Sequence, residues 1–259
     1  MPAELQSASQ GQTLILTLHN PERRNAIEPA MYAAGIEALG VAERNPDVRS
    51  VVITGAGETF SAGGNLQRLQ AMRHADPAER AQGIEGLHSW IEAIRTFPKP
   101  VIAAVEGAAA GAGFSLALAC DMAVAAHDAF FVMSYSNIAL SPDGGGSWSL
   151  VRALPRSLAL QWLMCGERVP ADRLHALGLL HSLVPHGQAL AAALALAETL
   201  NQRAPNALAS IKELVNEAPG QPLTAHLALE RDHFVRNLHH ANAGEGIAAF
   251  LEKRAPHYR

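Results

Sequence analysis

Two glycine-rich turns are the segments of this chain whose residue types could stabilise a reacting group. The first, 60–65 (Phe-Ser-Ala-Gly-Gly-Asn), follows the apolar run 51–53, and the second, 107–114 (Gly-Ala-Ala-Ala-Gly-Ala-Gly-Phe), follows 101–105. Small residues let a ligand approach backbone N–H groups. The apolar stretch 114–120 predicts a helix, whose first N–H groups lack partners and carry the positive end of the helix dipole. Two such donor sites at one point would form an oxyanion hole.

The two turns also have an explanation that involves no ligand. Glycine and alanine after a strand allow a helix to pack closely on a sheet. Dinucleotide binding is disfavoured, because the glycines of 107–113 lack the G-x-G-x-x-G spacing and no such turn follows the first strand. A P-loop is excluded, because no Gly-Lys-Ser/Thr follows.

A carboxylate stands in a third segment of small residues, 141–146, which reads Ser-Pro-Asp-Gly-Gly-Gly. Three glycines would leave the Asp143 carboxylate beside open space, where it could act as a base or a nucleophile. The same residue could instead cap a helix that runs to Val151, with the glycines in its first turn. The residues alone leave both interpretations open.

Length and composition limit the classes of protein. A chain of 259 residues, 49% of them hydrophobic, can bury a sizeable core as one large domain or as a domain with an appendage. The net charge of -4 shows no basic excess, so we expect no nucleic-acid partner. The 12 histidines are scattered without metal-ligand spacing, so we expect no metal site.

Compartment is predicted from targeting signals and cysteines. Residues 1–11 contain no charged segment followed by an apolar core, so we expect no signal peptide. The longest apolar stretch, 103–126, is interrupted by two acidic residues and several glycines, so we expect no membrane partner. Cys120 and Cys165 both have apolar neighbours, which predicts reduced core cysteines in a cytoplasmic protein.

The hydrophobic pattern alternates between strands and helices over roughly the first 155 residues. The predicted strands are 13–18, 50–54, 101–105 and 122–125, and the predicted helices are 29–45, 77–96 and 114–120. This β-α-β alternation predicts an α/β layer with parallel strands. The later predicted elements are helices at 155–164, 171–177, 189–202, 206–216, 224–238 and 244–254, with a short strand near 179–184. The last third is a helical appendage to the same domain or a small oligomerisation region.

The order of these segments, over nearly the whole chain, resembles the crotonase (enoyl-CoA hydratase/isomerase) superfamily. The resemblance is carried by 20–26 (Asn-Pro-Glu-Arg-Arg-Asn-Ala), 60–66, 99–107 (Lys-Pro-Val-Ile-Ala-Ala-Val-Glu-Gly), 111–121 and the tail 246–254. Each segment alone is weakly specific, but all of them in this order are highly specific. The resemblance implies an α/β fold with a crotonase-like β-β-α spiral core at 1–200 and a C-terminal helical trimerisation region at 201–259.

The resemblance also implies a substrate and the residues that bind it. The substrate is an acyl-CoA, so coenzyme A is part of the substrate and no separate cofactor is expected. The N–H groups of Gly64 and Ala112 form the oxyanion hole around the thioester oxygen. The implied contacts to CoA are Arg24, Ala26, Ala62, Leu66, Phe250 and Lys253. The last two match tail positions that reach a neighbouring subunit's CoA in a homotrimer or hexamer.

Two positions depart from the hydratases of the superfamily. Those enzymes use two glutamates to position and split water, and the matching residues here are Ser115 and Tyr135. Adding water to a double bond needs a base and an acid that act on one water molecule, and neither residue is a carboxylate. We therefore expect negligible hydration, with both residues in the substrate-binding site. Asn65 stands where many relatives carry Asp, and it can still form a turn.

Asp143 matches a catalytic aspartate of some branches. The segment 130–148 looks most like the 1,2-epoxyphenylacetyl-CoA isomerase branch, the ring-opening isomerases of phenylacetate degradation. By this resemblance, Asp143 moves a proton between carbons of an unsaturated acyl-CoA while the oxyanion hole holds the thioester enolate. The predicted reaction is therefore a double-bond or ring isomerisation.

Three other functions stay open at this point. In the aryl-CoA dehalogenase branch the matching aspartate attacks the ring as a nucleophile, and His88 falls at the place of the histidine that activates water. His88 could equally be a helix residue at the pocket rim, and Tyr135 stands where that branch has tryptophan. An enoyl-CoA hydratase and a non-catalytic binder of CoA esters are the other two. In each case we expect residues 67–96 to line the acyl pocket.

Overall fold

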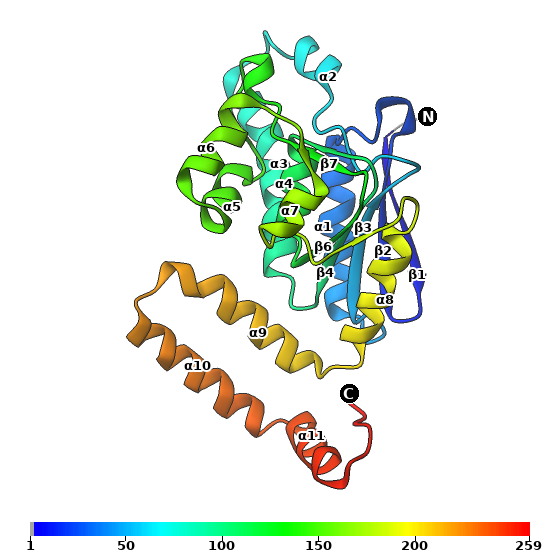
Figure 1. Cartoon of the computed structure of the whole chain (residues 1–259), viewed down its shortest axis with the longest axis vertical. Helices are drawn as coiled ribbons and strands as arrows, with labels where there is room; N and C mark the ends of the chain where they lie inside the picture. The colour runs from blue at the N-terminus through cyan, green and yellow to red at the C-terminus, as the bar shows by residue number, and fades with distance from the viewer. Residues whose placement is uncertain (1–2) are drawn as a thin grey trace.

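The computed structural model describes residues 3–259 and contains two β-sheets flanked by helices (Figure 1). The larger sheet has the strand order β1-β2-β3-β4-β6-β9, and the smaller sheet has the order β5-β7-β8. The α/β class predicted from the alternating pattern is confirmed. Residues 1 and 2, where the predicted core begins, lie outside the described residues.

Most of the larger sheet is parallel. Its strands are β1 (Glu4–Gln10), β2 (Thr13–His19), β3 (Ser50–Gly55), β4 (Val101–Val105), β6 (Met122–Ala126) and β9 (Ser182–Val184). From β2 to β9 each neighbouring pair is parallel, whereas β1 pairs antiparallel with β2 at the edge. The residues of β1 are mostly exposed and polar, which is why the hydrophobic pattern predicts no strand there.

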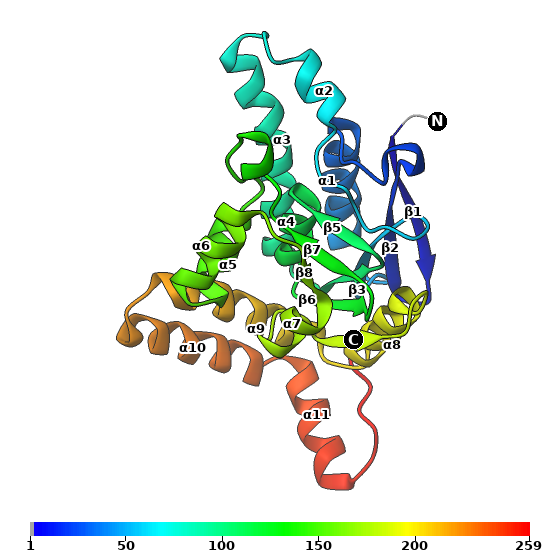
Figure 2. The same ribbon diagram turned by 45° about the horizontal axis from the view of Figure 1, so that its top comes forward.

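Helices cover both faces of the larger sheet (Figures 1 and 2). They are α1 (Pro29–Arg44), α2 (Leu66–Ala71), α3 (Pro77–Thr96), α4 (Ala112–Ala119), α5 (Gly146–Ala153), α6 (Arg156–Cys165), α7 (Ala171–Ala176) and α8 (Ala189–Asn201), with short 3-10 turns at Pro21–Arg23 and Ser136–Ile138. Val51 and Ile53 of β3 belong to the main core with residues of α1, α3 and α4. Val52 packs instead with alanines of α8. Both faces of β3 are therefore buried, as is usual for parallel strands covered by helices.

The smaller sheet makes the core a spiral. Its strands are β5 (Ala108–Ala110), β7 (Phe130–Val132) and β8 (Val169–Pro170). A short connection takes the chain from β4 of the larger sheet into β5, and α4 follows. The same passage recurs from β6 to β7, with α5 and α6 following. The predicted β-β-α order of the core is confirmed.

Three C-terminal helices extend away from the sheets (Figure 1). They are α9 (Pro205–Glu217), α10 (Leu223–Leu238) and α11 (Ala241–Glu252), with a 3-10 turn at Ala218–Gly220. Lys212 of α9 joins them to the core, donating at 2.9 Å to Asp121 and at 2.9 Å to the Ile94 carbonyl. The large apolar side chains that they leave exposed are Ile211, Val215, Leu223, Leu227, Phe234, Val235, Leu238, Ile247, Phe250 and Leu251. The division into units at residues 200 and 201 stays a prediction.

Some sequence-based expectations differ from the structure. The helix after the second glycine turn begins at Ala112, two residues before its predicted start at Phe114. Cys120 is buried, but Cys165 is exposed at the end of α6, so the prediction of two core cysteines is wrong for Cys165. Both cysteines are free thiols. No helix among residues 3–259 combines the length and the hydropathy needed to cross a membrane.

Candidate active site

The two glycine turns are hydrogen-bonded to each other. Ser61 N–H donates to the Ala108 carbonyl at 2.9 Å, and Ala110 N–H donates to the Ser61 carbonyl at 2.9 Å. A Cβ on Gly113 would lie 2.7 Å from the Ser61 Cβ. Gly63 has a φ of +90°, and a Cβ there would lie 2.6 Å from the Ala110 carbonyl oxygen. Glycine is therefore required for the close approach of the two turns, and helix packing without a ligand explains part of their composition.

The N–H donors predicted for an oxyanion hole lie in these joined turns. Ala112 is the first residue of α4, so its N–H has no acceptor within the helix. The Ala112 nitrogen lies 3.4 Å from the Cβ position of Gly63, next to Gly64 in the chain. Gly64 and Ala112 line one hollow of about 60 Å³ together with Asp143. We call it the central hollow.

Asp143 is held by the two residues that stand at the hydratase glutamate positions. The Tyr135 hydroxyl donates to the Asp143 Oδ1 at 2.6 Å, and the Ser115 hydroxyl donates to the Asp143 backbone carbonyl at 3.0 Å. Ser115 and Tyr135 are buried, whereas Asp143 is half-buried. The phenol fixes one carboxylate oxygen and leaves the other able to accept a proton. The arrangement provides one positioned carboxylate beside two backbone donors, which is suited to proton transfer at a carbon next to a carbonyl.

The glycines after Asp143 bring the turn close to Ser115. A Cβ on Gly146 would lie 2.7 Å from the Ser115 Oγ, and one on Gly144, whose φ is +58°, would lie 3.1 Å from the Ser115 Cβ. Helix α5 begins at Gly146 with Gly145 as its N-cap and without a side-chain cap bond. The interpretation of Asp143 as a helix cap is therefore wrong. Two of the glycines allow close packing and do not simply open space beside the carboxylate.

Two tyrosines in and beside the central hollow stay protonated. Burial raises the pKa of Tyr135 far above its usual range, and the charge of Asp143 and the hydrogen bond to it add to the rise. Burial also raises the pKa of Tyr32 to about 12, with the charge of Asp143 adding to the rise and that of Arg68 opposing it. Tyr135 is therefore a hydrogen-bond donor at neutral pH and a poor base.

The residues implied to contact CoA lie near the outer side of the first turn. Ala62 N–H donates to the Arg24 carbonyl at 2.9 Å, so these two residues are neighbours. Arg24, Ala62 and Leu66 are exposed, and Ala26 is buried beside them. The structure thus brings four of the implied CoA contacts to one area.

Three other predicted site residues lie apart from the central hollow. Phe250 and Lys253 are exposed at the end of α11, at the opposite end of the protomer from α2 (Figure 2). His88 is half-exposed on α3, with its Nδ1 4.0 Å from Glu85, and it is not among the residues that line the hollow. The structure therefore places His88 as a surface helix residue.

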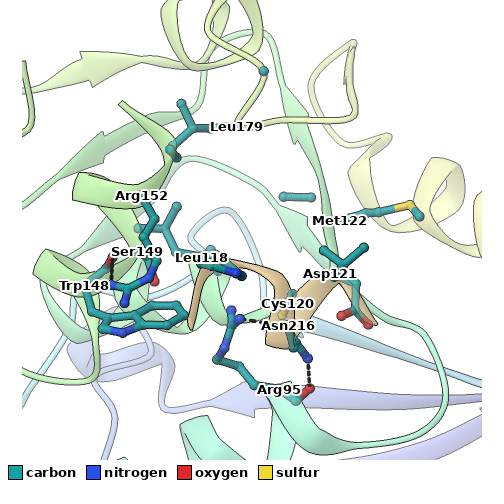
Figure 3. A pocket seen from close by; sticks show the side chains of 16 residues that line it. Arg95, Leu118, Cys120, Asp121, Met122, Trp148, Ser149, Arg152, Leu179 and Asn216 are labelled. Atoms are coloured by element: carbon teal, nitrogen blue, oxygen red, sulfur yellow. Dashed lines mark hydrogen bonds between the residues drawn. The ribbon is translucent and has the colours of Figure 1, made fainter. Parts of the chain in front are cut away.

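A larger cavity lies at the opposite end of α4. It has about 300 Å³ and is lined by residues of α4, α5 and the end of α9. Figure 3 shows Arg95 and Arg152 on Trp148, with guanidinium carbons 4.5 and 3.9 Å from the indole centroid. None of its lining residues belongs to the two glycine turns, so volume alone does not identify the site.

One cluster in the described chain has the side chains to hold a metal ion. The ligand atoms of Glu106, Asp128 and His186 lie within 4.8 Å of one another. Glu106, however, already accepts hydrogen bonds from Gly187 N–H and Ala189 N–H at the start of α8. His186 also pairs with Asp128 at 3.0 Å. These bonds explain the cluster without an ion.

The sequence model of the enoyl-CoA hydratase/isomerase family matches residues 9–259. The chain belongs to the enoyl-CoA hydratase/isomerase family. Its relatives include the 1,2-epoxyphenylacetyl-CoA isomerase of Escherichia coli K12, which is 36% identical over 250 residues, covering 95% of this chain and 94% of that protein.

Other relatives of this family member are named hydratases. The 2,3-dehydroadipyl-CoA hydratase of Escherichia coli K12 is 34% identical over 257 residues, covering 99% of each chain. A crystal structure of an enoyl-CoA hydratase from Polaromonas sp. JS666 is 69% identical, with a TM-score of 0.98 over 99% of this chain and 100% of that chain. The family and the fold are thus shown, while the names cover both isomerases and hydratases.

Sequence reasoning missed one lining residue of this family member and covered another only as part of a long segment. Tyr32 of α1 and Arg68 of α2 both line the central hollow. Arg68 lies within the segment 67–96 that was expected to line the acyl pocket, and lining residues from both α2 and α3 confirm that this segment borders the hollow. The sequence did not distinguish Tyr32 as a site residue, because its position in the helical pattern is that of an ordinary core residue.

Proposed function

We propose that this chain isomerises an unsaturated acyl-CoA by moving one proton through Asp143, while Gly64 and Ala112 hold the enolate of the thioester. The observation that carries the proposal is the 2.6 Å hydrogen bond from Tyr135 to Asp143. It fixes a single base beside the two backbone donors of the central hollow. Coenzyme A enters as part of the substrate, and the proton transfer uses side chains of this chain only.

The step balances with one base. For a β,γ-unsaturated ester, the Asp143 carboxylate removes a proton from the α-carbon, and the C–H electrons form a dienolate whose charge lies on the thioester oxygen. The Asp143 acid then returns a proton to the γ-carbon, which leaves an α,β double bond and regenerates the carboxylate. No water is consumed.

The two backbone donors make the enolate accessible. Removing one oxyanion donor typically costs about 3–4 kcal/mol of transition-state stabilisation. Gly64 and Ala112 together would therefore stabilise the thioester enolate by several kcal/mol. Without such stabilisation the enolate forms too rarely in water. Ala112 adds the dipole of α4 to its own N–H, because it is the first residue of that helix.

Proton transfer is favoured over the alternative reactions. A hydratase needs an acid and a base on one water molecule, whereas Ser115 and Tyr135 are committed to holding Asp143. The dehalogenase reaction needs a histidine to activate water, and His88 pairs with Glu85 outside the lining of the central hollow. A non-catalytic binder would have no use for a carboxylate held at the oxyanion site.

We further propose that the protein works as a homotrimer or a hexamer of this chain. The exposed apolar residues of α9, α10 and α11 need a cover in water. Phe250 is 84% exposed, and it lies far from the central hollow of its own protomer. Phe250 and Lys253 would therefore meet the CoA bound to a neighbouring copy.

The test is the variant Asp143→Asn, which keeps the size of the side chain and removes the base. We expect isomerisation of 3-hexenoyl-CoA, followed by the absorbance of the conjugated thioester, to fall by about 10²–10⁴-fold, the usual contribution of a positioned base. The affinity for the ester, measured by calorimetry, should change by only a few-fold. Unchanged turnover in the variant would remove Asp143 from the mechanism. Rapid hydration of crotonyl-CoA by the wild type would favour the hydratase instead.

A further inference from the structure

Two cations share the cavity of about 300 Å³ at the far end of α4. Arg95 lies in the last turn of α3 and Arg152 in α5, and both line the cavity together with Trp148. Their guanidinium carbons lie 4.5 and 3.9 Å from the centroid of the Trp148 ring, so the two groups converge on one indole (Figure 3). Like charges that converge in this way repel each other, and an anion beside both of them would remove the repulsion.

Neither guanidinium is paired with a carboxylate in the protomer. Arg95 donates to the Asn216 side-chain oxygen at 2.7 Å, and Arg152 donates to the Trp148 carbonyl at 3.4 Å. Within the described range 3–259, no carboxylate oxygen lies within 4.0 Å of a guanidinium nitrogen of either arginine. Burial lowers the pKa of Arg95, the charge of Asp121 opposes this effect, and the charge of Arg152 adds to it. A bound anion would therefore stabilise the charged form of Arg95.

The carboxylate that lines this cavity, Asp121, is already paired with other groups. Its Oδ2 accepts a hydrogen bond from Lys212 Nζ at 2.9 Å and another from Val101 N–H at 2.8 Å. Lys212 compensates the charge of Asp121, so the two arginines leave the cavity with an excess of positive charge. A planar guanidinium offers its donors in a fork that matches a carboxylate. The cavity therefore has the polar groups to bind an anion.

Much of the remaining lining is apolar. Leu118 of α4, Met122 of β6, Leu179 and Val215 of α9 line the same cavity, and Figure 3 shows the first three around it. Pockets for small ligands are typically apolar with a few polar groups, and about 300 Å³ is at the lower end of their usual volumes. The lining thus fits a small molecule that has an apolar body and one negative end.

We propose that this cavity is a second binding site, and that it binds a small organic carboxylate whose charge lies between Arg95 and Arg152. The apolar body of the ligand would contact Leu118 and Leu179. None of the residues that line this cavity lines the central hollow. The ligand is therefore bound separately from the acyl-CoA, and the inference does not depend on the isomerase reaction.

The test is a titration of the full-length, assembled protein followed by the fluorescence of Trp148, with the central hollow filled by butyryl-CoA. Trp90 and Trp162 are buried and do not line the cavity, so a ligand there should act mainly on Trp148. We expect hexanoate to change the emission in a saturable manner. Hexanamide, which has the same shape without the charge, should bind about tenfold more weakly or worse, since hydrogen bonds to a charged group are individually strong. Inorganic phosphate, which has no apolar body, should also bind more weakly than hexanoate.

Two outcomes of this titration would overturn the inference. The first is an emission that does not saturate with hexanoate, which would mean that the cavity of the assembled protein does not admit the ligand. The second is equal binding of hexanoate and hexanamide, which would mean that the arginines do not recognise the charge. Tighter binding of phosphate than of hexanoate would remove the apolar body from the ligand class.

Three variants locate the binding. Arg95→Gln and Arg152→Gln should each weaken the binding of hexanoate by about tenfold or more. Arg95 also joins α3 to Asn216 of α9, whereas Arg152 donates to a carbonyl of its own helix, so Arg152→Gln tests the charge with little effect on helix packing. Arg168→Gln is the matched control, because Arg168 is exposed and stacked on Phe130 at 4.7 Å but does not line the cavity. Unchanged affinity in both cavity variants, or an equal loss in the control, would contradict the proposed site.

A fourth variant, Trp148→Phe, identifies the source of the fluorescence signal. Phenylalanine keeps an aromatic ring beside the two guanidinium groups, so calorimetry should show that hexanoate still binds within a few-fold of its affinity for the wild type. The fluorescence response should disappear. A response that persists in this variant would place the ligand beside Trp90 or Trp162, outside the cavity, and would overturn the inference.

Discussion

At the scale of single residues, a phenol and a hydroxyl hold Asp143 from two directions. Tyr135 donates to its carboxylate and Ser115 to its backbone carbonyl. These two bonds fix the carboxylate that we propose as the base. Because burial raises the pKa of Tyr135 far above its usual range, the phenol keeps its proton and its donor role throughout the working range of pH.

The prediction at this scale is a loss of rate in Tyr135→Phe. The variant removes the hydroxyl that donates to the Asp143 Oδ1 at 2.6 Å. We expect kcat to fall by about tenfold or more, as for the loss of a hydrogen bond to a charged group. The measurement is kcat for 3-hexenoyl-CoA at neutral pH.

The matched control for that substitution is Tyr258→Phe, because Tyr258 lies in the tail, away from the central hollow. It should leave the rate unchanged. A wild-type kcat in Tyr135→Phe would show that the phenol does not act on Asp143.

At the scale of elements, the site depends on turns that approach one another closely. Gly63, Gly113 and Gly146 each face backbone or side-chain atoms where a Cβ would lie under 3.0 Å away. The turns that carry Gly64, Ala112 and Asp143 are therefore fixed by packing, so the donors and the base that we propose would be positioned before substrate binds.

The tail after α11 is an element held in a different way. Arg254 and His257 N–H both donate to Glu245, at 2.6 and 2.8 Å.

The pH response of this tail gives a second prediction. The hydrogen bonds from Arg254, and then the one from His257 N–H, lower the pKa of Glu245 from 4.5 to about 2. A lowered carboxyl pKa contributes stability that is complete above about pH 4.5 and is lost as the pH falls toward 2. Hydrogen exchange of residues 253–259, corrected for the intrinsic effect of pH, should therefore become faster over this window.

The Glu245→Gln variant is the control for the tail. It should exchange faster than the wild type at neutral pH and show little additional change on acidification. Equal protection of the tail in both proteins at pH 7 would contradict a role for Glu245.

At the scale of the whole molecule, the protomer separates two groups of predicted site residues. The central hollow lies at the ends of α2, α3 and α4, whereas Phe250 and Lys253 lie at the far end of α11 (Figure 2). One protomer cannot bring them together without unfolding its C-terminal helices. The homotrimer or hexamer that we propose would resolve this separation and cover the apolar side chains of α9, α10 and α11.

Mixed oligomers test this arrangement. Lys253→Gln alone should raise KM for CoA esters by about tenfold, equivalent to about 1.4 kcal/mol. Co-expression with Asp143→Asn should restore a fraction of sites with the wild-type KM, because an intact Asp143 and an intact Lys253 then come from different protomers. Sedimentation should show a trimer or a hexamer. If a mixed assembly contains no sites with the wild-type KM, then Lys253 either contacts the CoA of its own protomer or does not contact CoA.

The sequence by itself determined the local elements and the candidates for chemistry. The apolar runs at β2, β3, β4 and β6 and the glycine turns after β3 and β4 are patterns within short windows, so they could be recognised without a structure. Asp143 was likewise found from a segment of a few residues, whereas Gly64 and Ala112 were implied by the resemblance to the crotonase superfamily. The polar strand β1 and the exact start of α4 were missed, because neighbours in space decide them.

Only the tertiary structure decided what holds these groups and what surrounds them. Ser115 and Tyr135 are 28 and 8 residues from Asp143 in the sequence. Arg68 of α2 approaches Gly83 of α3 because the chain turns back between these two helices. Hydrophobic periodicity specifies which face of an element is buried, but not which polar side chains of other elements meet there. Because of the long-range packing of the turns, an aspartate that could have been a helix cap is instead a carboxylate held by a phenol.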